Sequence, residues 1–472
     1  MNRLLILIML TVTFISGCSR SHLDIFPDLE DPTLLERKLP VAQLHADIDA
    51  FIQTAQSLHP DLAQYADEKM VETLRKDIKA SITEPMTRET FFRHVGRLSH
   101  AFQDGHSLLI WPYQEYMQLR ENGHMHFPFL MTLSSEGVFT IKEYKSESEY
   151  LPLGAKILSV NDVAIEEILA NLQEFVGGES RRLREAVAVE RFPQMLWAGY
   201  GFVDEFAITY QLAGQTHSLT VGVNDGWQAV DQDSSLEGDF AFTPLEGAVG
   251  LLKVATFDVD PGLFEDALEQ AFASIKQNNI STLIIDIREN GGGNTDTATA
   301  LAQYIAHKPF LMVSQMSEKL NHNNRGWMHH KGNIGDIKVT PWTDYIEPQD
   351  EDVRFDGDVY VLIGPITYSA AIVFATTVQD NQFATLVGTP TGGYANQTAQ
   401  GNLFNLPNSQ LRAYIATRLL VRPSGDTKVA PVIPDILVES TQQDFQQGKD
   451  AAVEHILSKY RSTNIGQSAK FR

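Results

Sequence analysis

Ser369 stands at a strand-to-helix boundary in the sequence. The stretch from Val359 to Val378 is typical of an apolar strand, a Gly-Pro turn and an apolar helix that begins at the serine. A hydroxyl there lies at the positive end of a helix dipole, beside backbone N–H groups without an intrahelical partner. This position suits a nucleophile whose reaction builds an oxyanion. Serine is also a preferred N-cap residue, so the position alone leaves a purely structural role open.

A glycine-rich segment follows a second apolar strand. The stretch that begins at Leu283 ends with Asp286, Arg288, Asn290 and three consecutive glycines. Glycines let the backbone approach a substrate closely and direct N–H groups towards it. A tight strand-to-helix turn is the simpler alternative. A phosphate-binding loop is the other, but the Lys-Ser/Thr ending of a P-loop is absent.

A histidine in a third segment supplies the side chain that most often activates a serine. It is His106, within Asp104-Gly105-His106-Ser107. Imidazole is the usual general base for a serine nucleophile. An isolated histidine is more often a surface or core residue, so this interpretation depends on the other two segments.

Together the segments resemble the C-terminal processing (tail-specific) and tricorn-core family of serine peptidases. The resemblance runs in order through nearly the whole chain, and it rests on Asp104-Gly105-His106-Ser107, Asp286-x-Arg288-x-Asn290-x-Gly292-Gly293, Thr367-Tyr368-Ser369-Ala370-Ala371, Val387-Gly388-x-x-Thr391-x-Gly393 and Pro434-Asp435. It implies an α/β fold with a crotonase-like layered catalytic domain. It also implies a serine-type endopeptidase that acts on peptides or unfolded protein termini without a cofactor.

The resemblance also assigns the residues of the site. Ser369 would be the nucleophile, and the N–H groups of Gly292 and Ala370 would form the oxyanion hole. Processing proteases of this family use a lysine after the nucleophile, but Thr391-Gly392-Gly393-Tyr394 contains none. Tricorn-like members instead use a histidine from the N-terminal segment, which here is His106.

Two features of the base remain open in the sequence. Gly105 stands where the tricorn-like pattern has a serine before the histidine. The acid that orients His106 is unassigned: Asp104 is too close in sequence to be an obvious partner, and Asp435 and Glu439 are the candidates. Lys428 is the alternative base.

The order of periodic segments predicts several regions. Apolar residues at helical spacing begin at Val41, alternating strands and turn signals follow from about residue 126, and strand–helix alternation follows from about residue 241. The expected regions are a lipoprotein signal peptide at 1–17, a tether at 18–40, a helical region at 41–125, a PDZ-like β-domain at 126–223, a linker at 224–240 and the catalytic domain at 241–472. The PDZ-like expectation comes from a resemblance of Leu153–Asn161 to modules of bacterial processing proteases, and an unrelated small β-domain is the alternative.

The N-terminus has the pattern of an export signal. Arg3 precedes a short apolar run that ends in Ile15-Ser16-Gly17-Cys18, which holds the only cysteine of the chain. This ending resembles the bacterial lipobox, which implies that Cys18 is lipidated. A plain signal peptide is the alternative. The residue after Cys18 is a serine, which by the same resemblance implies a lipid anchor in the outer membrane, facing the periplasm.

Charge and composition exclude some classes of partner. The formal charge of −23 at pH 7 argues against nucleic acid, because no basic stripe is present to neutralise phosphates. No metal site is expected, since His124, His126 and the pair His329-His330 lack a tight set of carboxylate or cysteine partners. The oligomeric state is open. Two other functions are weighed: a catalytically silent ligand-binding protein on the same fold, and an ester or thioester hydrolase.

Overall fold

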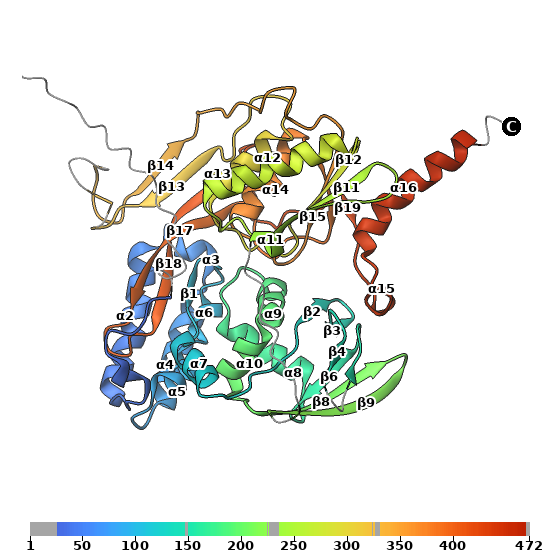
Figure 1. Ribbon diagram of the computed structural model, residues 1–472. Coiled ribbons are helices and arrows are strands. Elements are labelled where there is room, and N and C mark those ends of the chain that lie inside the picture. The colour runs from blue at the N-terminus through green and yellow to red at the C-terminus, as the bar shows by residue number, and fades with distance from the viewer. Residues whose placement is uncertain are drawn as a thin grey trace, which may run out of the picture.

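The computed structural model describes residues 26–146, 150–223, 225, 236–322, 324–325 and 331–468. The expected signal peptide, Cys18, most of the expected linker and the pair His329-His330 lie outside these residues. Within them, no helix is long and apolar enough to cross a bilayer. Figure 1 shows a C-terminal α/β body above two N-terminal regions, with strands β17 and β18 descending beside helix α2.

The first region is helical, as its apolar periodicity predicts. Thr87 caps the helix that follows it by accepting from Thr90 N. The helices are α2 (Val41–Leu58), α3 (Leu62–Tyr65), α4 (Glu68–Ser81), α5 (Arg88–Val95), α6 (Leu98–Ala101) and α7 (Tyr113–Glu121). One expectation needs correction: between α6 and α7 lies a strand, β1 (Ser107–Leu109), which joins a sheet of the C-terminal body.

The described end of the expected tether belongs to the fold. A 3-10 helix, η1 (Pro32–Leu35), precedes α2, and Leu39 forms a β-bridge with Met86. Leu34 and Leu39 are both buried in the core. Residues 26–40 are therefore not a free tether, because their apolar side chains pack against the helices that follow.

The second region is an antiparallel sheet with helices. Two of its hairpins turn around residues 134–137 and 213–214. The sheet order is β2-β3-β6-β8-β9, with β7 beside β6. The strands are β2 (Met131–Ser134), β3 (Gly137–Thr140), β6 (Lys156–Val160), β7 (Val163–Ala164), β8 (Glu205–Leu212) and β9 (Gln215–Gly222), with a separate pair β4 (Tyr144–Lys145) and β5 (Tyr150–Leu151).

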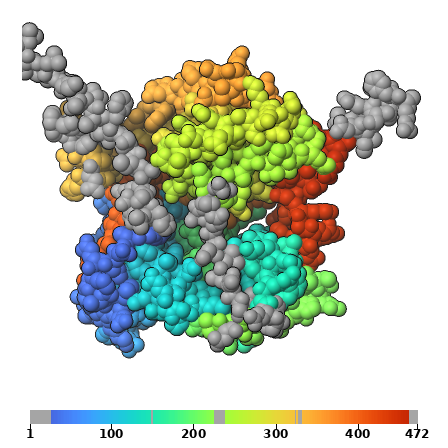
Figure 2. Space-filling view, in the orientation of Figure 1, coloured from blue at the N-terminus to red at the C-terminus, as the bar shows by residue number. Residues whose placement is uncertain are grey.

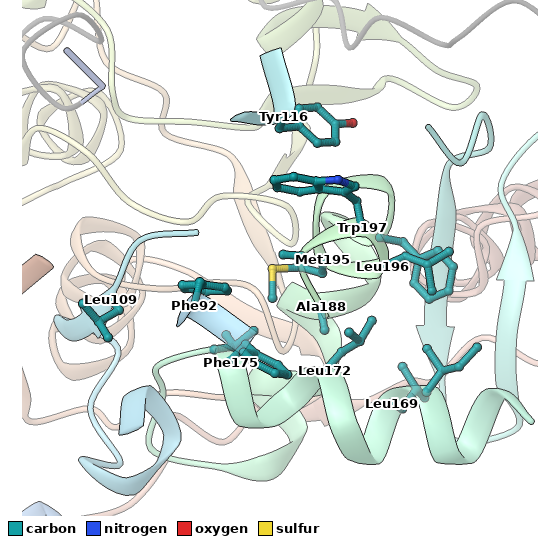
Figure 3. Packing of buried hydrophobic residues seen from close by; sticks show 14 of the residues in the cluster. Phe92, Leu109, Tyr116, Leu169, Leu172, Phe175, Ala188, Met195, Leu196 and Trp197 are labelled. Carbon is teal, nitrogen blue, oxygen red and sulfur yellow. The ribbon is translucent and has the colours of Figure 1, made fainter. Parts of the chain in front are cut away.

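The helices of the second region join it to the first. They are α8 (Ile165–Leu172), η2 (Gln173–Phe175), α9 (Arg181–Glu190) and α10 (Phe192–Tyr200), of which α9 and α10 were not expected. Figure 3 shows Phe92 and Tyr116 of the first region in one cluster with Phe175 and Trp197 of the second. The predicted boundary near residue 126 thus marks a change from helices to strands without separating two cores.

The C-terminal body is built on a mostly parallel sheet of order β10-β11-β12-β15-β16-β19. Strand β12 is buried on both faces, as its composition predicts, because helices cover each side. Alternate residues of β12 face two cores: Leu283 and Ile285 meet α12, α13 and α14, and Ile284 meets α16. The elements are α11 (Leu236–Asp239), β10 (Phe240–Pro244), β11 (Val249–Val254), α12 (Pro261–Gln277), β12 (Thr282–Asp286), α13 (Thr295–Gln303), β15 (Asp358–Ile363), α14 (Ala370–Asn381), β16 (Thr385–Gly388), β19 (Ile436–Leu437), α15 (Gln442–Gln447) and α16 (Ala451–Ser468).

A second sheet connects the body to the first region. It contains β13 (Gln315–Lys319), β14 (Ile337–Pro341), β17 (Gln397–Asn405), β18 (Arg412–Val421) and, from far earlier in the chain, β1. Strand β1 pairs antiparallel with β18, so that Ser107 lies opposite Ile415. Beyond β19, helix α15 packs on the second region, where Phe445 stacks on Phe139 with ring centroids 5.0 Å apart. Figure 2 shows this C-terminal segment beside the second region.

Candidate active site

Ser369 lies in the turn between β15 and α14, where its backbone is strained. Its φ and ψ angles are 53° and −122°, in a region that residues with a side chain rarely occupy. The turn is held by Thr367, whose hydroxyl accepts from Gly364 N at 3.0 Å and donates to Ile287 O at 2.9 Å. The Ser369 side chain makes no capping hydrogen bond to α14. The serine is presented as on a nucleophile elbow, which removes the helix-cap alternative.

His106 lies beside Ser369 in space although 263 residues separate them in sequence. Its Nε2 is 3.0 Å from the Ser369 Oγ. Strand β1 begins at the next residue. Its pairing with β18 places the His106 imidazole beside Ser369. Burial lowers the pKa of His106 below its ordinary value, against the opposing effect of Asp104. A neutral imidazole at this distance can accept the serine proton.

The other ring nitrogen of His106 connects to Asp104 through a hydroxyl. Thr398 Oγ1 lies 3.1 Å from His106 Nδ1 and 2.5 Å from Asp104 Oδ1. A carboxylate can only accept, so Thr398 donates to Asp104 and is free to accept from a protonated Nδ1. This arrangement leaves Nε2 as the acceptor for Ser369. Asp104, set aside in sequence as too close to His106, is therefore the carboxylate that is linked to it through Thr398.

Asp104 is itself fully buried and held by several donors. Ser107 Oγ donates to its Oδ2 at 2.6 Å, and His106 N donates to its Oδ1 at 3.1 Å. His59 Nε2 lies 3.1 Å from Oδ2, while His59 Nδ1 accepts from Asp61 N, which places the His59 proton on Nε2. Burial alone would raise the pKa of Asp104. The hydrogen bonds and nearby imidazoles outweigh that effect and hold the pKa well below its ordinary value.

The acids expected from the sequence lie elsewhere. Asp435 accepts from Leu386 N at 2.8 Å, and Glu439 accepts from Ser135 N at 3.2 Å, so both stabilise backbone segments away from His106. Neither carboxylate contacts His106 in the described part of the chain. Both carboxylates have local polar partners, which is the physical reason for the correction.

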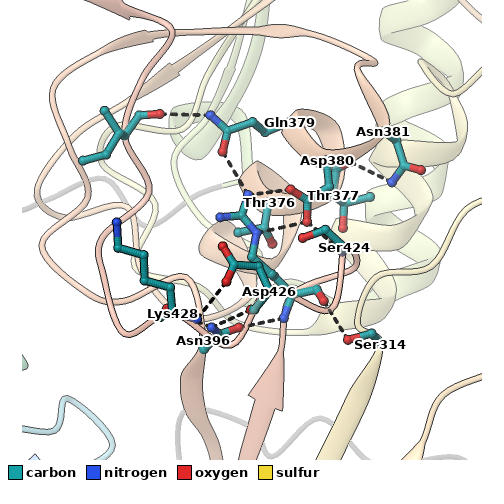
Figure 4. Close-up of polar contacts among 12 residues, drawn as sticks. Ser314, Thr376, Thr377, Gln379, Asp380, Asn381, Asn396, Ser424, Asp426 and Lys428 are labelled. Carbon is teal, nitrogen blue, oxygen red and sulfur yellow. Dashed lines mark hydrogen bonds and ion pairs between the residues drawn. The ribbon is translucent and has the colours of Figure 1, made fainter.

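Lys428 also serves a local structure. Its carbonyl accepts from Asn396 Nδ2 at 2.9 Å, within a polar cluster that includes an ion pair between Asp380 and Arg422 (Figure 4). Asn396 directly precedes Gln397 and Thr398, so this cluster fixes the start of β17. None of the contacts described for Lys428 reaches Ser369, and the alternative base receives no support.

The two expected oxyanion donors differ in their availability. The N–H of Ala370 is at the first residue of α14 and has no acceptor among the described residues. Gly292 lies directly against the nucleophile, since a Cβ there would be 2.5 Å from Ser369 Cβ. Its N–H, however, donates to Asn290 Oδ1 at 2.8 Å. In this conformation Ala370 provides a free donor, and the Gly292 donor is engaged within its own loop.

Two further contacts around the pair were not expected from the sequence. The Tyr368 ring lies 5.0 Å from the His106 ring, centroid to centroid, at an interplanar angle of 30°. Gln397 Nε2 donates to the Ser369 carbonyl at 2.7 Å and so restrains the strained turn. Only Tyr368 could have drawn attention in the sequence, because it is adjacent to the nucleophile.

The histidines outside the site have other surroundings. His124 contacts Asp204 at 2.8 Å. His126 is buried against Tyr116, with ring centroids 3.8 Å apart. Over the ranges that the structure describes, no group of three His, Cys, Asp or Glu side chains is arranged to hold a metal ion.

Known proteins match this chain at several levels. The model of peptidase family S41 matches residues 248–438. The tail-specific protease of Haemophilus influenzae is 24% identical over 230 residues, which are 47% of this chain and 29% of that protein. The carboxy-terminal-processing protease of Bartonella bacilliformis is 26% identical over 237 residues, which are 48% of each chain. This chain therefore spans half or less of the length of the curated relatives that it matches.

The fold is shared more widely than the sequence. The structure of mature CPAF complexed with lactacystin has a TM-score of 0.66 and 15% identity, covering 90% of this chain and 98% of that one. At this identity the likeness shows a mixed α/β fold in common. The resemblance inferred from the sequence motifs is confirmed by the family match and by the curated relatives: residues 248–438 of this chain match the model of peptidase family S41, and the two relatives are a tail-specific and a carboxy-terminal-processing protease.

Proposed function

We propose that this chain is a serine endopeptidase that cleaves peptides or unfolded protein termini through an acyl-enzyme on Ser369, with His106 as general base. The observation that carries the proposal is the 3.0 Å contact between His106 Nε2 and the Ser369 Oγ. The strained turn at Ser369 and the neutral, buried imidazole support the same assignment. No feature of this pair requires a cofactor.

The steps follow from the donor and acceptor directions. Ser369 Oγ attacks the substrate carbonyl carbon as its proton passes to His106 Nε2. The imidazolium is stabilised by Asp104 through the Thr398 hydroxyl, and Ala370 N–H donates to the oxyanion. His106 then gives the proton to the leaving amine, and water hydrolyses the acyl-enzyme by the reverse sequence. Gly292 acts as the second oxyanion donor by sharing its hydrogen between Asn290 and the oxyanion.

Labelling with a fluorophosphonate probe tests this mechanism. Wild-type protein should be labelled, and the Ser369→Ala and His106→Ala variants should not. A folded wild-type protein that is not labelled by the probe would contradict the proposal and favour the catalytically silent ligand-binding alternative. Labelled protein that hydrolyses esters or thioesters but no peptide would favour the hydrolase alternative.

We propose finer assignments for the fold and its regions. The layered sheet and helices from residue 241 onward would be a crotonase-like catalytic domain, and residues 126–223 would be a PDZ-like module. The antiparallel sheet with α8 supports the second assignment, and the packing of α15 on β3 argues that a peptide cannot add freely at that face. Titration with peptides of random sequence, with and without residues 439–472, would measure whether this module binds an extended chain.

We also propose a lipid anchor at Cys18 and a position in the cell envelope, at the outer membrane facing the periplasm. The support is the sequence Ile15-Ser16-Gly17-Cys18. Incorporation of labelled palmitate into the wild-type protein but not into Cys18→Ser is the expected result. Equal incorporation into the wild-type protein and Cys18→Ser would contradict a lipid anchor at Cys18. Fractionation of the labelled protein would show which membrane holds it.

A further inference from the structure

A buried turn of the second region passes behind the catalytic base. The turn precedes α9 and begins with two glycines. A Cβ at Gly177 would lie 2.8 Å from the Asp104 carbonyl oxygen, so only glycine permits this approach. Gly178 has a φ of +148°, and Ser180 Oγ donates to Gly392 O at 2.7 Å. The turn therefore lies between the loop that holds His106 and the loop that follows β16.

Glu179 lies at the centre of this turn and is 5% exposed. Its Oε1 accepts a hydrogen bond from the Tyr368 hydroxyl at 2.9 Å. Its Oε2 has no hydrogen-bond partner within the described part of the chain. Burying a carboxyl group with one hydrogen bond lowers the stability of the folded protein, because the group loses its hydration. An apolar side chain of similar size would avoid this desolvation. Packing alone gives no reason for a glutamate here.

The Tyr368 hydroxyl connects this carboxyl to the base. It lies 3.3 Å from His106 Nδ1, and the two rings are tilted by 30° at 5.0 Å. One phenol can accept from Nδ1–H and donate to a carboxylate at the same time. This is a second path from Nδ1 to a carboxyl group, in parallel with the path through Thr398 to Asp104.

We propose that Glu179 is a positioning residue for the base, which acts through the Tyr368 hydroxyl to orient His106 and to keep its proton on Nδ1. The inference rests on the proposed role of His106 as general base. It makes the second region a contributor to the catalytic machinery, because Glu179 belongs to the turn between η2 and α9.

The charge of Glu179 depends on its surroundings. Burial and the nearby Asp104 raise the pKa of Glu179 to about 8. Several titratable or charged groups face it from the elements packed around it: Tyr65, Asp104, His106, Arg184, Tyr368 and Tyr394. Above this pKa the carboxylate is a strong acceptor for the Tyr368 proton, and below it the neutral carboxyl is a weaker one. Positioning of His106 should therefore strengthen as the pH rises through about 8.

The first test measures fluorophosphonate labelling against pH. Glu179→Gln and Tyr368→Phe should each lower the maximal inactivation rate roughly 10-fold with unchanged probe affinity. Both should remove an ionisation near pH 8 that the wild type shows. The double variant should be no slower than either single variant, because both changes break one path. Glu190→Gln is the control: Glu190 is the last residue of α9 and has no described contact with Tyr368.

Losses that multiply in the double variant, or a pH profile unchanged by Glu179→Gln, would overturn the inference. A second readout separates it from the proposed function. In protein labelled with ¹⁵N-histidine, the His106 signal, assigned with His106→Ala, should show the Nδ1–H tautomer in the wild type. It should show a mixture of tautomers in Glu179→Gln. Failure of the wild type to react with the probe would count against the proposed function only, whereas an identical tautomer in both proteins would count against Glu179.

Discussion

The phenol of Tyr368 occupies the space that a side chain on Gly105 would need. A Cβ at position 105 would lie 2.4 Å from the Tyr368 hydroxyl oxygen. A glycine at position 105 therefore leaves the room that the Tyr368 phenol occupies beside His106.

Gly105→Ala should slow fluorophosphonate labelling by roughly 10- to 100-fold, because Tyr368 must move and the His106 ring packed against it must follow. The inactivation rate constant measures this effect. Gly262→Ala is the control, since a Cβ there would approach only the side chain of Asp260, the N-cap of α12, at 3.3 Å. Labelling of Gly105→Ala at the wild-type rate would show that the tyrosine does not hold the imidazole.

Thr398→Val should lower the labelling rate by about 10²-fold, because it removes the hydroxyl between His106 and Asp104. Thr398→Ser keeps the hydroxyl and should lose far less. Comparison of the two rates isolates the hydrogen bond from the loss of packing. If valine and serine had equal effects, the path through Thr398 would contribute nothing to the base.

The stability of the protein should respond to pH through Glu179. Its folded pKa of about 8 lies above the value of about 4.3 for an unfolded glutamate. Between these values the folded state binds a proton that the unfolded state releases, so this residue makes stability fall as the pH rises through the window. The melting temperature of Glu179→Gln should match the wild type near pH 5 and exceed it near pH 8.5. A difference that stays constant with pH would contradict the shifted pKa.

Removal of one partner from the buried ion pair between α5 and α7 should destabilise the protein. Arg88 Nη1 lies 3.1 Å from Glu115 Oε1, and both side chains are almost fully buried. Arg88→Met should lower the free energy of unfolding in urea by about 3–5 kcal/mol, because it leaves Glu115 without its counter-ion. Adding Glu115→Leu should restore much of the loss. Arg354→Met, at the pair with the exposed Glu351, is the control and should cost less than about 1 kcal/mol.

The sequence predicts those parts of the fold that have local signals. The apolar strand in the stretch that begins at Leu283 and the apolar helix that begins at Ser369 both appear where the sequence places them. Helices α9 and α10 were missed although Ser180 caps α9 and Gly201 ends α10 in a left-handed conformation. Their apolar faces pack against other elements, which no local pattern reports.

The residues of the candidate site also fall into two groups, those that stand in sequence motifs and those that do not. Ser369 and His106 stand in motifs, and the structure places them in contact, whereas Thr398 and Glu179 stand in no motif. Asp104 reaches His106 through a hydroxyl 294 residues further along the chain. Contacts of this kind depend on how β1, β17 and β18 assemble. Single-sequence periodicity carries no information on that assembly.

The pairing of β1 with β18 sets the order in which activity can arise during synthesis. His106 leaves the ribosome early, but the strand that holds its segment beside Ser369 begins only at Arg412. A nascent or truncated chain that ends before that strand carries both reacting groups without a scaffold to join them. The contact between His106 and Ser369 therefore becomes possible only after synthesis has passed β18.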